Sequence, residues 1–185
     1  MYFKKIVYLS FFIFLYLLFS CNKEENRFRK QINNRDVEVQ LEQFSDSLFK
    51  LKLLVNDSLN STWPLKYPVY KFDYGDITGN GTAIAVGVIK PTRFDPKPDK
   101  RLFLFKITDD YYIRPLWMGS RVGQPLEDFR IINSHKPALI RTIEREQDET
   151  YLVAEYKWRG FGLEFMHYIQ REISMKEAQK LLQNK

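Results

Sequence analysis

The spacing of hydrophobic residues changes several times along this chain, and each change predicts a different kind of segment. An apolar run fills residues 6–19, and a polar stretch follows over residues 22–35. Over residues 36–60 the apolar positions recur at alternating intervals of four and three, and from residue 67 they fall in short runs between turn residues. We therefore expect a leader over 1–20, a flexible tether over 21–35, a helix over 36–60, and a β-domain over 61–185 that ends in a short helix.

Residues 36–60 fit one face of an amphipathic helix. Polar residues lie between the apolar positions, as a helix with one buried face requires. Two interpretations follow, namely a partner helix of a short coiled coil and a helix docked on its own domain. The apolar positions are Val37, Leu41, Phe44, Leu48, Leu51 and Val55.

The segment from residue 67 predicts an antiparallel, mainly β domain. Short apolar runs rich in β-branched and aromatic residues are separated by Gly, Pro, Asn and Asp, which is typical of strands joined by turns. Ser174 and Glu177 form a capping-box pattern that predicts the start of a final helix. The expected strands are 69–72, 83–89, 101–107, 111–117, 129–132, 138–143, 151–158 and 161–169.

Residues 1–20 have the order of an export signal. Lys4 and Lys5 precede the apolar run, and Ser20 stands directly before Cys21. A basic start, an apolar core and a small residue before the cleavage point indicate a secretory signal peptide. The run is shorter than the roughly 20 residues of a spanning helix, although an uncleaved anchor and a plain cleaved signal stay open as alternatives.

Residues 18–21 resemble the lipobox of bacterial lipoproteins, with Phe19 bulkier than the usual residue. The resemblance implies that Cys21 receives a diacylglycerol, that the leader is cut before it, and that the new amine is acylated. Several acyl chains on one residue hold a protein firmly to a membrane. Residues 23–25 resemble the signal that sends Bacteroidota lipoproteins to the cell surface. The expected location is the cell envelope, as an outer-membrane lipoprotein displayed at the surface.

Charge and cysteine content narrow the function classes. The 185 residues carry a net charge of +6, and the first 20 carry two lysines and no acid, which leaves +4 on residues 21–185. These charges are interspersed, so the sequence has no nucleic-acid footprint. Cys21 is the only cysteine, which excludes an internal disulfide and, once it is lipidated, a thiol nucleophile.

The stretch DYGDITGNG at residues 73–81 resembles the FG-GAP repeat of integrin-type β-propellers. The resemblance implies that Asp76, Thr78 and Asn80 supply oxygen ligands to Ca²⁺ while Gly81 makes the turn. This loop has Thr78 and Asn80 where the family usually has acids, and it lacks the closing acid. A cage with one carboxylate binds Ca²⁺ weakly, so a purely structural turn is the competing interpretation.

A second, more altered copy of this pattern begins at Asp128, in DFRIINSHKPALIRTIE. His135 and Lys136 stand where acids would be, so this copy predicts no calcium loop. The interval of about 50 residues between the copies fits a blade-sized repeat. Two such units do not close a ring, and we therefore expect an incomplete propeller of blade-like sheets.

The sequence contains few catalytic signals. His135 and His167 are the only histidines, and the nucleophile-elbow, zinc-protease and phosphate-loop motifs are absent. Arginine and tryptophan near loops and strand ends are typical of binding hot spots; the competing interpretation makes the tryptophans core residues and pairs the arginines with nearby acids. The candidate binding residues are Arg93, Arg101, Trp117, Arg121, Trp158 and Arg159.

These observations favour a non-enzymatic binding or interaction module that is anchored to the membrane and takes a protein or a glycan as its ligand. The first alternative is a hydrolase or accessory enzyme acting on envelope glycans, because paired carboxylates on separate strands leave no local signature. A second alternative is a structural lipoprotein that binds a partner only through residues 36–60. Apart from the weak Ca²⁺ prediction, no cofactor is expected.

Overall fold

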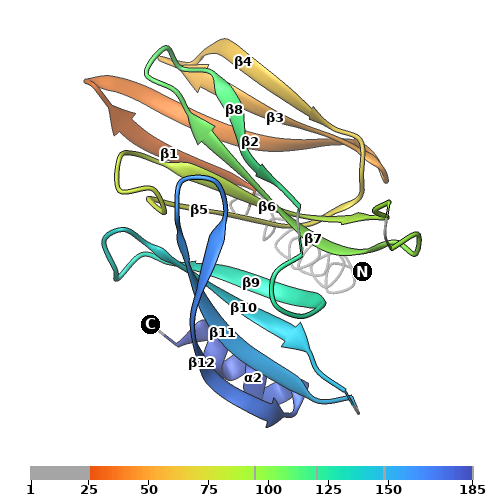
Figure 1. Ribbon diagram of the computed structural model, residues 1–185. Coiled ribbons are helices and arrows are strands. Elements are labelled where there is room, and N and C mark those ends of the chain that lie inside the picture. The colour runs from red at the N-terminus through yellow and green to blue at the C-terminus, as the bar shows by residue number, and fades with distance from the viewer. Residues whose placement is uncertain (1–25, 94, 120, 148, 185) are drawn as a thin grey trace, which may run out of the picture.

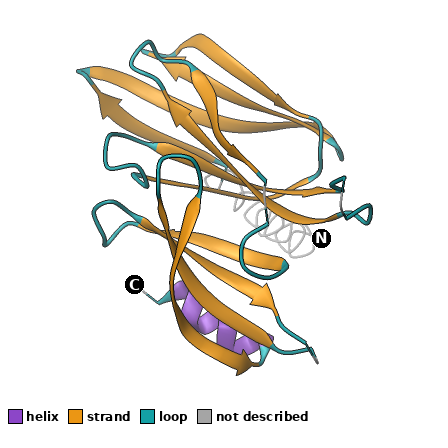
Figure 2. Cartoon of the chain, in the orientation of Figure 1, coloured by secondary structure: helices purple, strands orange, loops and turns teal. Residues whose placement is uncertain are grey.

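A computed structural model describes residues 26–184 except residues 94, 120 and 148. Within these residues the chain forms twelve strands and one helix (Figures 1 and 2). The leader and Cys21 lie outside the described residues, so cleavage and lipidation stay predictions.

The strands form three four-stranded antiparallel sheets, each made of consecutive strands (Figure 1). Sheet A contains β1 (Arg27–Ile32), β2 (Arg35–Ser45), β3 (Leu48–Val55) and β4 (Ser58–Leu65). Sheet B contains β5 (Val69–Gly75), β6 (Ala83–Lys90), β7 (Asp99–Ile107) and β8 (Ile113–Met118). Sheet C contains β9 (Leu126–Ile132), β10 (Leu139–Arg145), β11 (Tyr151–Trp158) and β12 (Leu163–Ile173).

The sheets are stacked as three layers with sheet B in the middle (Figure 1). On β6, Ile84 and Val86 pack into the core shared with sheet A, whereas Ala85 packs into the core shared with sheet C. This alternation explains why the strand reads as a continuous apolar run, since both of its faces are buried. Sheet B therefore joins two hydrophobic cores into one domain.

The predicted mainly β, antiparallel fold is confirmed. All eight expected strands correspond to β5 through β12, and the final helix is α2 (Met175–Gln183). Residues 73–81 and the stretch that begins at Asp128 lie in the hairpins β5–β6 and β9–β10, which are the first two strands of sheets B and C. Four-stranded meanders stacked face to face are compatible with an incomplete propeller of three blades.

The helix predicted over residues 36–60 is wrong, because this segment forms nearly all of β2, the whole of β3 and the first three residues of β4. The same sequence has a second period, of two residues, which places Val37, Val39 and Leu41 on one face of β2 and buries all three. The helical pattern needed Phe44 and Leu48, and these are 53% and 42% exposed at the β2–β3 turn. The segment forms strands because the two-residue spacing places all of these apolar side chains on one face, which the sheet buries.

The tether predicted over residues 21–35 is wrong where the structure describes it, since residues 27–32 form β1. Phe28 on β1 is only 4% exposed. Asn33 and Asn34 have φ values of 48° and 60°, which is the left-handed conformation of a tight two-residue hairpin turn. The β-domain therefore begins at Arg27 and not at residue 61.

The two outer faces of the stack differ in what covers them. The outer face of sheet A is charged, with Arg29 paired to Glu38 and Lys52 paired to Glu42. The outer face of sheet C is covered by α2, whose Ala178 and Leu182 are fully buried. The three layers thus enclose the two inner cores, with ion pairs on one outer face and a helix covering the other.

Buried polar side chains connect sheet C to its neighbours. The Glu144 carboxylate is fully buried and accepts hydrogen bonds from the Thr142 hydroxyl, the Tyr156 hydroxyl and the Gln124 amide. Arg141 pairs with Glu155 at 2.9 Å and also donates to the carbonyl oxygens of two residues at the end of α2. These contacts hold the loop before β9 and the helix against one sheet.

The capping box of α2 predicts a pH-dependent contribution to stability. The Ser174 hydroxyl and amide donate to the Glu177 carboxylate, and these hydrogen bonds hold the pKa of that carboxyl below its usual value of 4.5. A lowered carboxyl pKa stabilises the fold above the unfolded pKa, and this contribution is lost as the pH falls through the folded pKa. Ser174→Ala also removes the hydroxyl that accepts from the Glu177 amide, and loss of such an N-cap typically costs about 1 kcal/mol. Urea unfolding should show a smaller difference at pH 3 than at pH 7, and an unchanged difference would contradict the role of Glu177.

Candidate functional site

The first strands of the three sheets lie next to one another along one side of the molecule. The Phe28 ring on β1 stacks on the Tyr74 ring on β5, with centroids 4.2 Å apart and an interplanar angle of 19°. Asp73 on β5 accepts a 2.7 Å hydrogen bond from the Ile131 amide on β9. These contacts bring β1, β5 and β9 together, and we call the surface along them the first-strand groove.

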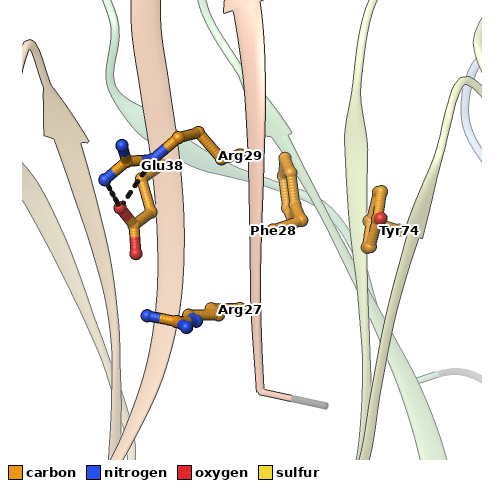
Figure 3. A pocket seen from close by; sticks show the side chains of 5 residues that line it. All are labelled: Arg27, Phe28, Arg29, Glu38 and Tyr74. Atoms are coloured by element: carbon orange, nitrogen blue, oxygen red, sulfur yellow. Dashed lines mark hydrogen bonds and ion pairs between the residues drawn. The ribbon is translucent and has the colours of Figure 1, made fainter. Parts of the chain in front are cut away.

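Two hollows form this groove, and they are continuous because Arg27 and Tyr74 line both. The upper hollow, of about 510 Å³, is lined by Arg27, Phe28, Arg29, Glu38 and Tyr74 (Figure 3). The lower hollow, of about 790 Å³, is lined by Asn26, Arg27, Tyr70, Lys71, Phe72, Asp73, Tyr74, Lys100, Glu127, Asp128, Arg130, Met175, Gln179 and Gln183. Residues from all three sheets and from α2 therefore share one open surface.

The upper hollow wraps around the edge strand β1. Figure 3 shows Arg27, Arg29 and Glu38 on one side of this strand, and the stacked Phe28 and Tyr74 rings on the other. Alternation of side chains along a strand produces this arrangement. A ligand at the free edge of β1 would meet guanidinium groups on one side and an aromatic ring that is 43% exposed, that of Tyr74, on the other.

The charges of the upper hollow are unequally engaged. The Gln40 amide and the Arg29 guanidinium donate to the Glu38 carboxylate and hold its pKa below its usual value. The same contact with Glu38 raises the pKa of Arg29. Arg27 forms no hydrogen bond or ion pair with another described residue, although its charge helps to lower the pKa of Glu38. Its guanidinium can therefore still bind a ligand.

The lower hollow contains acids that are already engaged in structural contacts. Lys100 pairs with Glu127 at 2.7 Å, and Lys71 pairs with Asp128 at 2.8 Å. Burial raises the pKa of Asp73, although its carboxylate accepts two backbone amide hydrogen bonds. Each of these carboxylates therefore holds neighbouring strands together.

The Tyr70 hydroxyl in the same hollow is buried and has no partner among the described residues. Burial, together with the nearby carboxylates of Asp128 and Glu127, raises the pKa of this phenol. The hydroxyl therefore stays protonated and can donate a hydrogen bond. An unsatisfied buried hydroxyl is costly, so a ligand oxygen that accepts this hydrogen bond would gain affinity.

The six predicted binding residues do not form one surface. Arg93 is exposed in the β6–β7 loop, and Arg159 is exposed in the β11–β12 turn, where it pairs with Glu164 at 3.2 Å. Arg101 is 4% exposed and pairs with Asp95, and it lines a small, partly open hollow together with the exposed Arg121.

The two tryptophans of that set, Trp117 and Trp158, are partly buried against the core between sheets B and C. This placement agrees with the alternative prediction that the tryptophans are core residues. Any further role of these two side chains in binding stays a prediction.

The Asp76 loop is organised by its own backbone. One Asp76 carboxylate oxygen accepts from the Gly79 amide at 2.8 Å and the Gly81 amide at 3.1 Å, and the Thr78 hydroxyl accepts from the Asn80 amide. Gly79, with φ of 80°, has the left-handed conformation that favours glycine. Within residues 26–184, apart from the three gaps, no group of three or more His, Cys, Asp or Glu side chains is placed to hold a metal ion.

We therefore expect Asp76 to stabilise the turn in the absence of metal. Asp76→Ala removes the acceptor of two amides and should lower the free energy of unfolding by about 1–2 kcal/mol, whereas Asp76→Asn retains an acceptor oxygen and should cost less. Thermal unfolding with and without millimolar Ca²⁺ separates the two interpretations. A melting temperature that rises with Ca²⁺ in the wild type, but not in Asp76→Ala, would instead establish the FG-GAP-like metal site.

The first-strand groove was not predicted from the sequence. Arg27, Phe28 and Arg29 fell inside the expected tether, although an apolar residue between charged ones, followed by Asn33 and Asn34, is the pattern of a short strand and a hairpin turn. The two histidines are both on the surface, and His167 lies 3.6 Å from Glu155. Neither histidine lines the groove.

Among the residues that the structure describes, no helix has the length and apolar character needed to cross a membrane. No protein-family model matches this chain, and a search of curated proteins finds no sequence that matches it.

Proposed function

We propose that this chain is a lipid-anchored protein of the cell envelope whose β-domain is a non-enzymatic binding module, with the first-strand groove as its binding surface. The observation that carries the proposal is the open groove along β1, β5 and β9. The groove begins at Asn26, five residues after Cys21. Five residues span at most about 18 Å, so lipidation of Cys21 would hold the groove close to the membrane surface.

The composition of the groove favours a protein ligand over a glycan. Arginine and tyrosine are enriched at the hot spots of protein interfaces, and the groove presents Arg27, Arg29 and Arg130 together with Tyr70 and Tyr74. Free strand edges also suit an extended peptide, because backbone hydrogen bonds then add to side-chain contacts. The proposed ligand is therefore an extended segment of another envelope protein.

The engagement of the groove acids favours a binding module over a hydrolase. A glycosidase needs two carboxyl groups that can exchange a proton or attack the substrate. Glu127 is tied to Lys100 and Arg145, Asp128 is tied to Lys71, and Asp73 accepts backbone amides. Acids held in this way support the shape of the groove.

Photo-crosslinking in cells tests the binding surface. A photoreactive residue replacing Tyr74 should capture a specific protein, whereas the same residue at Tyr112, which is 46% exposed and outside the groove, should not. Arg27→Ala should weaken the capture from position 74, and Arg114→Ala, at an exposed arginine on β8, should leave it unchanged. Equal capture from both positions, or no effect of Arg27→Ala, would contradict the proposal.

The hydrolase alternative has its own readout. Purified protein is incubated with envelope glycans, and the release of reducing ends is measured for the wild type, Glu127→Gln and Asp128→Asn. The binding module predicts no turnover by any of the three proteins. Turnover by the wild type that either variant abolishes while its melting temperature is retained would establish the enzyme instead.

A further inference from the structure

Strand β12 is an unusually exposed edge of the molecule. It has 11 residues and pairs with β11 on one side, and no strand pairs with its other side among the described residues. Its main contacts are with β11 and with α2. Figure 1 shows it at the outer rim of sheet C. Its free backbone groups are a template for pairing with another chain.

The exposed side chains of β12 are largely apolar. Phe165, Met166 and Tyr168 are 44%, 41% and 44% exposed. A register shift in the β11–β12 pairing, between Glu155 and Tyr156, brings Phe165 and Tyr168 together with ring centroids 4.6 Å apart. These three large apolar residues lie within four positions and form an exposed apolar patch, whose contact with water is unfavourable.

Two other sheet edges, β4 and β8, carry a feature that discourages pairing. Each contains a proline, Pro64 and Pro115 respectively. Proline cannot donate a backbone hydrogen bond and is a common means of protecting a strand edge. β12 contains no proline, and no Asp, Glu, Lys or Arg lies between positions 165 and 170.

We propose that β12 pairs antiparallel with β12 of a second copy of this chain, which joins the two C sheets into one eight-stranded sheet. The charge pattern favours a second copy in this orientation. Glu164 lies near the start of β12 and Arg171 near its end, so an antiparallel copy brings the acid of one chain toward the base of the other. A parallel copy would place like charges side by side, which is unfavourable.

The symmetry of this contact limits the assembly to two chains. An antiparallel contact between identical strands is isologous, so each copy uses the same surface and no second β12 edge is left free. Glu164 already pairs with Lys157 and Arg159, and Arg171 already pairs with Glu146. Because these charges already have partners within their own chain, they contribute mainly to the orientation of the contact. The apolar patch and the backbone hydrogen bonds supply the affinity.

Sedimentation equilibrium on residues 21–185 with Cys21→Ser tests the proposal without the lipid. A concentration-dependent dimer is expected, saturating by about 100 μM. Met166→Lys should weaken the dimer by about tenfold or more, because it places like charges near one another across the pair. Tyr112→Lys, at a similarly exposed site away from the edge, should leave it unchanged. A wild type that stays monomeric at this concentration would overturn the proposal, as would a dimer that Met166→Lys does not weaken.

Single cysteines give the orientation of the contact. The Cys21→Ser background contains no other cysteine, so one cysteine placed along β12 can form a disulfide only with a second copy. In an antiparallel pair, a residue near the centre approaches its own counterpart within disulfide distance, and residues at the ends do not. Oxidation should therefore link copies through positions 166–168 and not through 164 or 171. Linking that is equally efficient at position 112 would contradict the proposed pairing.

Discussion

Glu144→Ala is expected to lower the free energy of unfolding by about 3–5 kcal/mol, because it leaves several buried donors without an acceptor. The carboxylate is fully buried, and it accepts from Thr142 at 2.6 Å and from Tyr156 at 2.8 Å. It also accepts from the amide of Gln124 in the loop that carries the chain from sheet B to sheet C. The loss should therefore loosen the connection between the two sheets as well as the sheet itself.

Two matched variants separate these contributions. Glu144→Gln keeps one acceptor oxygen for the hydroxyls and should cost less than alanine. Tyr156→Phe removes the hydroxyl that donates to Glu144 and accepts from Gly123, and should cost about 1–3 kcal/mol. Urea unfolding of the Cys21→Ser protein measures all three. A Glu144→Ala protein within 1 kcal/mol of its parent, a loss no larger than about one ordinary hydrogen bond, would show that the network contributes little.

Arg141→Ala is expected to cost about 3–4 kcal/mol, because it leaves Glu155 charged and buried without its partner. Arg141 and Glu155 are 8% and 5% exposed. The same guanidinium donates to the carbonyls of Leu181 and Asn184, both at 2.7 Å. A cation at the end of a helix satisfies carbonyls that have no partner within the helix and opposes the negative end of its dipole.

Hydrogen exchange shows whether this loss acts through the helix. The amides of α2 should lose protection in Arg141→Ala before those of sheet B do. Arg130→Ala is the control, since Arg130 also donates to the end of α2, at Gln183, but is less buried and forms no ion pair with an acid among the described residues. It should cost less than about 1 kcal/mol. Equal losses in both variants would contradict a special role for the Arg141–Glu155 pair.

The sequence predicts sheets B and C well because their turn signals are strong. Glycine and proline punctuate the strands from residue 67 onward, and each apolar run is too short for a helix. Sheet A contains no glycine and only one proline, Pro64, so its turns depend on Asn33–Asn34, Asp46–Ser47 and Asn56–Asp57. Asn56 and Asp57 have φ values of 49° and 62°, and this pair is the local signal that separates β3 from β4.

The periodicity of sheet A is ambiguous in itself. Val37, Leu41, Leu51 and Val55 fit a helical spacing as well as a strand spacing. Residues on one face of a strand recur every two positions, and so they also recur every four positions, as residues on one face of a helix do. Pairing of Val37 with Val55 and of Leu41 with Leu51 resolves the ambiguity in space. Contacts between residues this far apart in sequence do not appear in a local pattern.

The first-strand groove depends on three-dimensional stacking and so has no local signal. Phe28, Tyr74 and Ile131 come from three different sheets and meet only because the sheets stack in register. Arg141, Glu144 and Glu155 did carry a signal, since each is a charged residue inside an apolar strand. A charge at such a position predicts a buried ion pair or hydrogen-bond network, although its partners cannot be named from sequence.

Membrane display through Cys21 is the central claim of the proposed function, because a groove held near a membrane presupposes the anchor. Fractionation of cells that express the wild type or Cys21→Ala, followed by protease treatment of intact cells, tests it most directly. The proposal predicts that the wild type is recovered in the membrane fraction and that Cys21→Ala is released. Protease sensitivity of the wild type would place the domain on the cell surface, and protection would place it on the periplasmic side. Retention of Cys21→Ala in the membrane would contradict lipid anchoring and would point to an uncleaved apolar leader.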